Sequence, residues 1–173
     1  MPKVNEQQFL EFYDQHVGKI YRYIYFRVGS EEQAQDLTSE VFLKSWQYLS
    51  GEQKNPSQKQ LDNPRAFFYQ VARNLISDFY RQKDRLPLSL EEITDKLVAD
   101  KSSNPGETAS VALEMASVKK ALAGLNEEYR EVIIWRYLDE LEIKEIAQIL
   151  DKKEGAVRTL LSRALASLKE VLK

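Results

Sequence analysis

The sequence predicts an all-α protein built from two small helical domains that a flexible acidic linker joins. Apolar residues recur every three or four positions near both ends of the chain, and no stretch shows the strict alternation of a half-buried strand. Between these regions the helical pattern fades into a polar and acidic segment. The 173 residues, of which 43% are hydrophobic and 30% charged, suit a globular chain with room for one domain or two small ones.

The first domain is expected to span residues 1–85 and to contain three helices. The first helix runs from about Phe9 to Val28, where Gly29 supplies a left-handed stop. Ser30 then opens a capping box for the second helix. Asn63-Pro64 starts the third, because Asn is a favoured N-cap and Pro a favoured first helical residue. We expect this third helix to be buried on one side only.

The linker and the second domain follow. Residues 86–117 hold six acidic residues against two lysines and are expected to form the linker. The second domain, residues 118–173, opens with a helix that Asn126 caps and Asp139-Glu140 ends. A shorter helix is expected from about Ile143 to Leu150.

The end of the chain has the layout of a DNA-reading helix-turn-helix. Asp151-Lys152-Lys153 separates the short helix from a final helix whose Val157 and Leu161 point inward. At ~100° per residue, the polar and basic residues of the final helix point outward together; they are Arg158, Thr159, Ser162 and Arg163. Residues 151–173 hold six lysines and arginines against three acids. An ordinary helical hairpin with a solvated outer face has the same pattern and stays open as an alternative.

The composition argues against several functions. The chain has no cysteine and one histidine, His16, so thiolate zinc sites are excluded and we expect no metal and no cofactor. The sequence shows no grouping of nucleophile and base and no Gly-rich phosphate loop, so we expect no enzyme. No apolar run approaches the ~18 residues of a spanning helix and the amino terminus lacks the layout of a signal peptide. We therefore expect a cytoplasmic protein without membrane insertion.

Three ordered stretches resemble one family. "EIAQIL" followed by "VRTLLSRA" resembles the carboxy-terminal domain of the extracytoplasmic-function, or group IV, sigma factors of bacterial RNA polymerase, within the housekeeping-type sigma family. "AQDLTSEVFLKSWQYL" resembles the helix by which that family binds core polymerase, and "NPRAFFYQVARNLISDFYR" resembles its minus-ten-element helix. The resemblance runs from about Phe9 to Leu172 and leaves only the linker unmatched.

The resemblance implies a division of labour between the two domains. The amino-terminal domain, a sigma region 2 helical bundle, would dock on the β′ clamp helices of core RNA polymerase and hold the melted non-template strand of the minus-ten element. The carboxy-terminal domain, a sigma region 4 helix-turn-helix, would read the minus-thirty-five element in duplex DNA and touch the β flap. The resemblance also implies an anti-sigma factor that sequesters the same faces.

The resemblance further assigns residues to these surfaces. The docking face for core polymerase would comprise Asp36, Ser39, Glu40, Leu43, Lys44 and Gln47. The minus-ten surface would combine basic and polar groups along the DNA backbone with one aromatic ring for an unstacked base; the residues are Arg65, Arg73, Asn74, Arg81 and Phe67. The minus-thirty-five surface would comprise Lys152, Lys153, Arg158, Thr159, Ser162 and Arg163.

The chain departs from the family's pattern at several positions. Leu160 stands where arginine is usual, which removes one expected DNA contact. Glu140 and Asp151 stand where glycine is common. Asp tolerates the left-handed backbone region better than most residues, so we expect the second of these turns to form more readily than the first.

Two other classes of function stay open. A stand-alone helix-turn-helix transcription regulator with a helical sensing or dimerisation domain would bind duplex DNA unaided, although a net charge of −2 gives poor non-specific affinity. A helical adaptor that binds only proteins would not need the basic strip. A subunit that polymerase holds beside DNA needs only weak contacts of its own, so the charge favours a sigma factor. That interpretation also explains Leu43 among polar neighbours.

Overall fold

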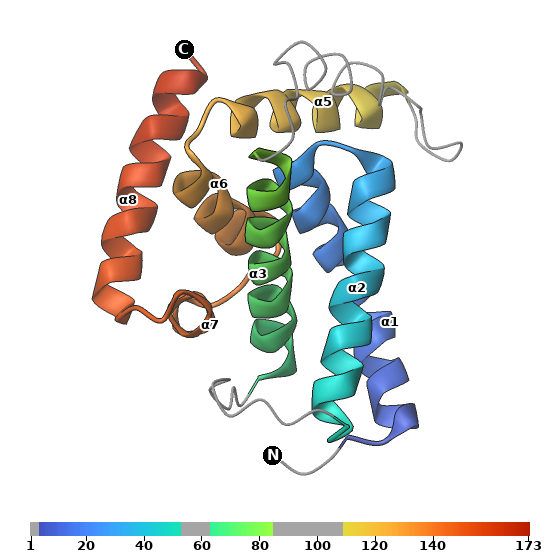
Figure 1. Ribbon diagram of the computed structural model, residues 1–173. Coiled ribbons are helices and arrows are strands. Elements are labelled where there is room, and N and C mark those ends of the chain that lie inside the picture. Colours follow the sequence, from blue (N-terminus) through green and yellow to red (C-terminus); the bar gives the residue numbers. More distant parts are fainter. Residues whose placement is uncertain (1–3, 53–62, 85–108) are drawn as a thin grey trace.

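The computed structural model describes residues 4–52, 63–84 and 109–173, and within these ranges it contains helices and turns but no strand. In chain order the helices are α1 (Glu6–Val28), α2 (Glu31–Leu49), α3 (Pro64–Asp84), α5 (Ala109–Ala123), α6 (Glu127–Ile133), the π-helical turn η1 (Ile134–Leu138), α7 (Ile143–Leu150) and α8 (Glu154–Val171). Figure 1 shows α1, α2 and α3 as one bundle and α8 at the edge of the molecule. The predicted all-α fold is confirmed.

The first bundle, α1 to α3, begins and ends its helices close to the predicted residues. The Asn5 side chain accepts a hydrogen bond from the Gln8 amide at 2.8 Å and starts α1 slightly earlier than predicted. Gly29 ends α1 in the left-handed conformation, with φ 74°. The Ser30 hydroxyl accepts from the amide of the third residue of α2, and the Asn63 side chain accepts from an amide of α3. Local side-chain caps therefore fix the three helices.

The core of this bundle is aromatic. Phe68 of α3 is fully buried, and its ring centroid lies 5.0 Å from that of Phe42 on α2 and 6.3 Å from that of Phe9 on α1. All three helices thus contribute a ring to one cluster, which burial of apolar surface stabilises. His16 of α1 lies at the edge of this cluster, 5.6 Å from Phe68, where burial and the nearby Arg65 and Lys19 lower its pKa.

The second body, α5 to α8, differs from the prediction at its beginning. Helix α5 starts at Ala109, inside the segment expected to be linker. The stretch ASVALEMAS consists largely of Ala, Leu, Met, Glu and Ser, and the first four of these favour helix. The remainder of the predicted linker, residues 86–108, lies outside the described residues.

The turns of the second body confirm several sequence predictions. The Asn126 side chain accepts from the Tyr129 amide at 2.9 Å and caps α6. Glu140 and Asp151 both adopt the left-handed conformation, with φ 57° and 53°. Asp151 and the next two residues form the turn between α7 and α8, as the helix-turn-helix layout requires.

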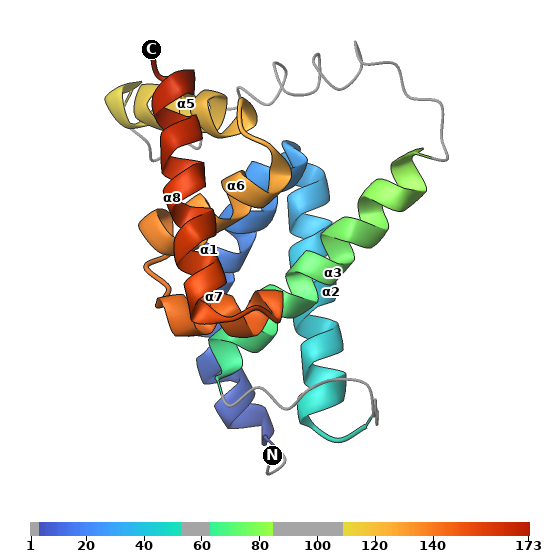
Figure 2. The ribbon, with the colours of Figure 1, turned by 90° about the vertical axis from the view of Figure 1, so that its left-hand side faces the viewer.

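The two bodies pack against each other. Helix α7 packs on α3, and α6 packs on α1. Figures 1 and 2 together show α6 and η1 between α8 and the first bundle. Trp135 of η1 is fully buried where the bodies meet, with its ring centroid 5.5 Å from Tyr23 of α1 and 6.1 Å from Tyr69 of α3. A single hydrophobic core therefore runs through both bodies.

Candidate nucleic-acid interface

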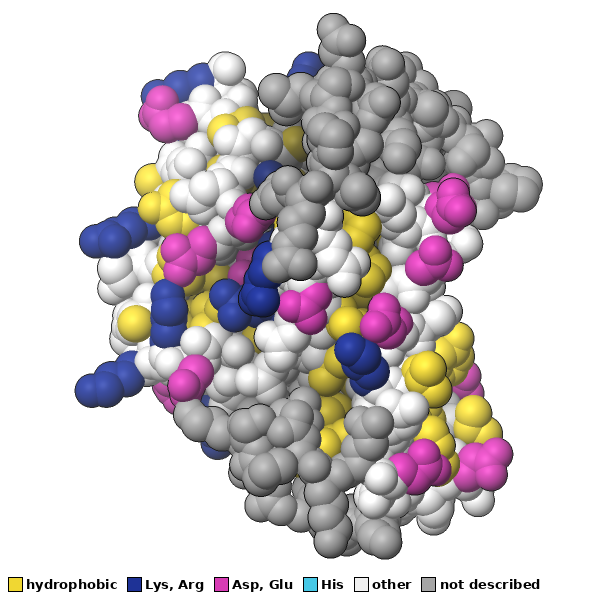
Figure 3. Space-filling model, in the orientation of Figure 1, with side chains coloured by type: hydrophobic (Ala, Val, Ile, Leu, Met, Phe, Trp, Pro, Cys, Tyr) yellow, Lys and Arg dark blue, Asp and Glu magenta, His cyan; other side chains and the backbone are white. Residues whose placement is uncertain are grey.

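One edge of the molecule is formed by the turn after α7 and by α8. The six residues predicted for the minus-thirty-five surface are all exposed there; they are Lys152, Lys153, Arg158, Thr159, Ser162 and Arg163. Figure 3 shows basic side chains along this edge, over α8. Their ion pairs are exposed, with Arg158 NH2 3.4 Å from Glu154 and Lys152 Nζ 2.8 Å from Glu128. Such pairs are weak enough for DNA phosphates to replace.

Leu160 does not lie on this edge. The sequence comparison with the family pattern placed it at a DNA-contacting position, but its side chain is only 8% exposed. It belongs to the inward row of α8 together with Val157, Leu161 and Ala164. The reason is helical geometry, since three residues after Val157 the side chain returns to the same face. Leucine at this position therefore packs the domain in this chain.

The residues predicted to face polymerase lie along α2. Asp36, Ser39, Glu40, Leu43 and Lys44 are exposed, and Gln47 is half-buried. Leu43 is 57% exposed among these polar groups, while Lys44 Nζ and Glu40 form an exposed ion pair at 3.5 Å. A hollow of about 430 Å³ between α2 and α3 adjoins this face.

The minus-ten residues on α3 divide into two groups. Asn74 and Arg81 are exposed. Arg65 and Arg73 are only partly exposed, because each guanidinium group donates hydrogen bonds to a carboxylate of the second body. The prediction that α3 is buried on one side only holds for its second half, where Asn74, Ser77 and Arg81 are exposed. It is wrong for the first half, because α7 also packs on α3 and Glu145 of α7 pairs with Arg65.

Phe67 also differs from the prediction. Its ring is 2% exposed and stacks on Tyr48 of α2, with centroids 5.1 Å apart, so it offers no face to an unstacked base in this structure. Tyr69, two residues further along α3, is likewise buried, at the junction of the bodies. Most of the polar segment between α2 and α3, residues 50–63, lies outside the described residues.

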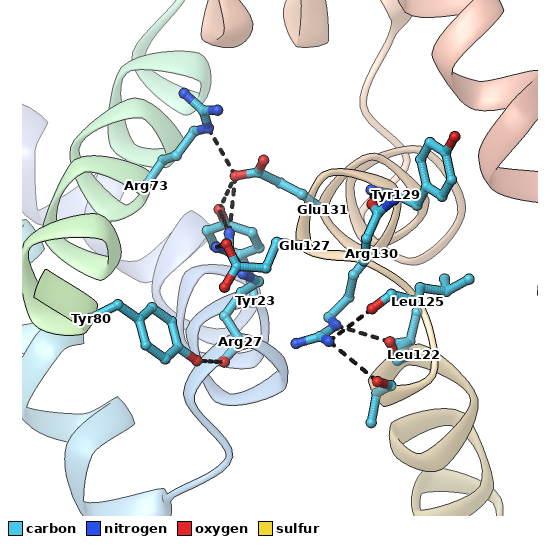
Figure 4. A network of polar contacts seen from close by, with 12 residues as sticks. Tyr23, Arg27, Arg73, Tyr80, Leu122, Leu125, Glu127, Tyr129, Arg130 and Glu131 are labelled. Atoms are coloured by element: carbon cyan, nitrogen blue, oxygen red, sulfur yellow. Dashed lines mark hydrogen bonds and ion pairs between the residues drawn. The ribbon is translucent and has the colours of Figure 1, made fainter. Parts of the chain in front are cut away.

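Glu131 is the centre of a buried polar network between the bodies. Figure 4 shows three side chains converging on it: Tyr23 and Arg27 from α1 and Arg73 from α3. The Tyr23 hydroxyl donates to Glu131 Oε1 at 2.7 Å, Arg27 NH1 at 3.1 Å and Arg73 Nε at 3.0 Å. Burial, followed by the negative charge of Glu131, raises the pKa of Tyr23 well above its usual value. The network thus joins a carboxylate of α6 to both α1 and α3.

Two further carboxylates complete this junction. Asp139, fully buried after η1, accepts from the Tyr69 hydroxyl at 2.6 Å and pairs with Arg22. Glu145 of α7 forms a side-on ion pair with Arg65. The NH2 group of Arg65 lies 2.7 Å from Oε1 and 2.6 Å from Oε2 of Glu145, and the Nε of Arg65 lies 3.1 Å from Oε1. Partial burial raises the pKa of Glu145, but hydrogen bonds from Arg65, from the Glu142 amide and from Asn63 outweigh it and lower the pKa overall.

These three carboxylates were missed by sequence reasoning, although a signal was present. Glu131 lies four residues before Trp135 and therefore on the same face as a large buried ring. Glu145 directly precedes Ile146 and lies four residues before Ile149, within the strongly apolar α7. An acid at such a position is rarely buried without a cationic partner. The identity of that partner depends on the distant packing of α3 and was not readable.

The described residues show neither a metal cluster nor a membrane-spanning helix. Among residues 4–52, 63–84 and 109–173, no group of three or more His, Asp or Glu side chains is placed to hold a metal ion. No helix in the described part of the chain is both long and apolar enough to cross a bilayer.

Two regions of the chain match known protein families. Residues 12–86 match the family described as Sigma-70 region 2, and residues 115–168 match Sigma-70, region 4. The extracytoplasmic-function RNA polymerase sigma factor BldN of Streptomyces coelicolor is 33% identical over 95% of this chain, which spans 60% of BldN. The factor SigL of Mycobacterium tuberculosis is 32% identical over 92% of this chain and 86% of its own length.

A solved structure is similar in its fold. The sigma factor RpoE, in complex with the anti-sigma factor NepR from Bartonella quintana, superposes with a TM-score of 0.70 over 96% of this chain and 97% of RpoE. The two sequences are 20% identical, so this likeness concerns the fold alone.

Proposed function

This chain belongs to the extracytoplasmic-function RNA polymerase sigma factors, and on that premise we propose how its surfaces divide the work of promoter recognition. The region comprising residues 1–85 docks on core polymerase and holds the minus-ten element. The region comprising residues 118–173, extended at its start by α5, reads the minus-thirty-five element. Residues between them act as the tether. The chain carries out no catalytic step of its own, and within the housekeeping-type sigma family it falls in group IV.

The observation that carries this proposal is the exposed edge of α8. Its inward row packs the domain, while two arginines, a serine and a threonine face solvent together with the lysines of the turn. Guanidinium groups pair side-on with guanine edges and with phosphates, and hydroxyls serve either partner. The helix-turn-helix presents this edge to a major groove in the manner of other proteins that use the motif.

The polymerase surface is proposed for α2. Leu43 is exposed among charged neighbours, and an apolar side chain there gains from a partner that covers it. The β′ clamp helices would supply that partner, and the β flap would contact the carboxy-terminal domain. A protein of net charge −2 then binds promoters because polymerase raises its local concentration beside DNA. The family membership likewise favours this function over a stand-alone regulator.

The minus-ten surface is proposed for the exposed and partly exposed cations of α3. Arg65, Arg73, Asn74 and Arg81 lie along one helix and offer basic and polar groups to the backbone of a single strand. Phe67 supports this surface from the core rather than stacking on a base. The chain acts in the cytoplasm with polymerase, and an anti-sigma factor of the kind bound to RpoE is its proposed inhibitor.

The test is reconstituted transcription. The purified chain is added to core RNA polymerase and a library of promoter fragments, and transcript 5′ ends are mapped. We expect starts at a defined set of sequences that core polymerase alone does not use. The absence of specific starts from every template, with a folded chain, would contradict the proposal.

A pair of leucine variants tests the docking surface within the same assay. Leu43→Ala is expected to weaken association with core polymerase by about 1–2 kcal/mol, the free energy of covering one leucine. Leu10→Ala is the matched control, because Leu10 is 54% exposed on α1, outside the proposed surface. If the two variants bind core polymerase equally well, polymerase contacts a surface other than the one that contains Leu43.

A further inference from the structure

The start of α8 carries an acidic side chain on an edge that is otherwise basic. Glu154 is the first residue of α8, and its side chain is 49% exposed. Figure 1 shows this end of α8 beside α7, at the outer edge of the molecule. Glu154 lies four residues before Arg158 and therefore on the same face of the helix. The edge proposed to read the minus-thirty-five element thus begins with a carboxylate that was not predicted to belong to it.

Helix capping does not account for this acid. Helix α7 begins with a capping box, in which the Glu145 side chain accepts a hydrogen bond from the Glu142 amide. Helix α8 begins at Lys153 without a side-chain cap hydrogen bond, and Glu154 occupies the first helical position rather than the third, which a capping box requires. Its charge also suits the helix dipole. The dipole accounts for a negative charge in this turn but predicts no effect on the choice of DNA sequence.

The rest of the first turn of α8 carries almost no side-chain bulk. Gly155 and Ala156 follow Glu154, and both are exposed. Gly155 lies in the α-helix without a positive φ, and a Cβ added to it would meet no atom within 4 Å. Glycine is less favourable than alanine in a helix, yet neither the backbone nor the packing of this chain requires glycine at this position. The bare turn therefore leaves room for a partner molecule to approach the helix closely.

The major groove of duplex DNA is the partner that this turn fits. In helix-turn-helix proteins the first residues of the second helix contact the edges of the bases. Gly155 and Ala156 have no polar side-chain atom, so Glu154 is the residue of these three whose side chain can form hydrogen bonds with a base. Phosphate groups repel a carboxylate, so the favourable partner of Glu154 at DNA is a hydrogen-bond donor on a base.

The chemistry of the carboxylate favours cytosine. An ionised carboxylate only accepts hydrogen bonds, and in the major groove the donors are the amino groups of cytosine and adenine. In adenine the N7 acceptor lies beside the N6 amino group and repels the second oxygen of the carboxylate, whereas cytosine presents its N4 amino group alone. Guanine and thymine present the acceptors O6 and O4 instead. Glu154 is therefore expected to prefer cytosine to the other three bases.

Arg158 complements this acid. Its NH2 group lies 3.4 Å from Oε2 of Glu154, and both side chains are exposed. A long and exposed ion pair is weak, so it orients the guanidinium group and leaves other donors free. These donors suit O6 and N7 of a guanine. One acid and one arginine on neighbouring turns thus offer matching groups to a cytosine and to a guanine.

We propose that Glu154 is a specificity-determining residue that selects a cytosine in the minus-thirty-five element by accepting a hydrogen bond from its N4 amino group, and that Gly155 lets the helix come close enough for this contact. This inference rests on the function proposed above. Because phosphates repel the carboxylate, Glu154 lowers the affinity for DNA in general and raises the discrimination between sequences. Arg158, by contrast, raises the affinity as well.

The experiment measures base preference in transcription by the complex of the full chain with core polymerase. The templates are randomised over the minus-thirty-five region upstream of a mapped start, and each carries a transcribed barcode. The wild-type chain is expected to enrich cytosine at one position on the order of tenfold over guanine or thymine. Glu154→Gln is expected to switch that position toward adenine, because glutamine pairs with N6 and N7 of adenine. Glu154→Ala is expected to remove the preference at that position and to leave the other positions unchanged.

Two matched controls make the result specific. Glu170→Gln removes the same charge from the last turn of α8, where Glu170 pairs with Lys173 at 3.2 Å, and is expected to leave the preference unchanged at every position. Gly155→Ala is expected to lower transcription from templates with the selected element severalfold, because a methyl group now separates the helix from the bases. Gly18→Ala, on α1, is its match and is expected to leave transcription unchanged, since a Cβ there also meets no atom within 4 Å. Neither alanine is expected to destabilise the fold.

Defined outcomes overturn the inference. Specific starts with no cytosine preference in the wild-type profile, or with the same profile in Glu154→Gln, refute the role of Glu154 and leave the proposed function standing. An equal change of profile in Glu170→Gln shows that net charge is responsible. If both variants of Glu154 lose discrimination at all positions together, or fail to fold by circular dichroism, the acid only holds α8 in place and the inference is wrong. The absence of specific starts with the wild-type chain refutes the proposed function, and the inference with it.

Discussion

The edge of α8 and the face of α3 were predicted to bind DNA from the same kind of pattern. In the structure, however, the edge of α8 is exposed, whereas the face of α3 is partly covered by the second body. Both helices place arginines and small polar groups opposite an apolar row. On α8 these groups are exposed, and their ion pairs are local and weak. On α3 two of the arginines are paired with carboxylates of another body. A helix's own pattern therefore identifies a binding surface, but the packing around it decides whether that surface is available.

The largest expected effect concerns the aromatic contact that covers α3. Trp135→Ala removes a fully buried ring from between the two bodies and is expected to lower the free energy of unfolding by about 3–5 kcal/mol. Tyr137→Ala is the control, because Tyr137 lies in the same turn but is 52% exposed. Thermal unfolding followed by circular dichroism gives both values. Similar losses in the two variants would show that the bodies are not held together through Trp135.

The next largest effect concerns the exposed edge of α8. Replacing Arg158 and Arg163 by alanine is expected to weaken binding of a duplex carrying the recognised minus-thirty-five sequence by about 1–3 kcal/mol for each residue, with unfolding changed by less than about 0.5 kcal/mol because both side chains are exposed. Lys169→Ala, on the same helix, serves as the control. Electrophoretic mobility shifts with polymerase present measure the affinities. Undiminished binding by the double variant would leave α8 without a role in DNA reading.

A third prediction sharpens the boundary of that surface. Leu160→Arg restores the residue usual in the family but places a guanidinium group in the inward row, so it is expected to destabilise the fold by about 2–3 kcal/mol. Thr159→Arg, at the exposed neighbouring position, is expected to leave stability nearly unchanged. Urea unfolding of the two variants measures this difference in stability. Tighter promoter binding by Leu160→Arg at unchanged stability would mean that position 160 faces DNA.

The smallest expected effect is the acid dependence of the ion pair between Glu145 and Arg65. The pKa of Glu145 lies below its ordinary value of 4.5, so its ionised form stabilises the packed state at higher pH and this contribution is lost as the pH falls through the lowered pKa. The difference in urea midpoint between the wild-type chain and Glu145→Gln should therefore shrink as the pH falls from neutrality toward about 3. With Glu11→Gln, at an exposed position of α1, we expect no such trend. A difference that grows on acidification would contradict the sign of this coupling.

Local structure was largely predictable because local contacts determine it. Asn126 caps α6, Gly29 ends α1, and α7 has the predicted bounds, since each depends on residues within one helical turn. The exposed strip of α8 follows from helical periodicity in the same way. These features need no knowledge of the rest of the fold.

The arrangement of the two bodies was not predictable for the same reason. Phe67 was assigned to an outer surface because the pattern of α3 alone cannot show that Tyr48 of α2 covers its ring. The pairing of Arg65 with Glu145 joins α3 to α7 across eighty residues. A buried acid such as Glu131 signals only that some cation is near. Which cation it meets is decided by tertiary packing.

The central claim, that polymerase holds α3 on one promoter element and α8 on another, is tested most directly by one distance. The chain has no cysteine, so Ser77→Cys on α3 and Ala166→Cys on α8 introduce two exposed sites for spin labels. Double electron–electron resonance is expected to give one narrow distance for the free chain and a longer one after core polymerase is added. A broad distribution in the free chain, or an unchanged distance in the polymerase complex, would contradict the account.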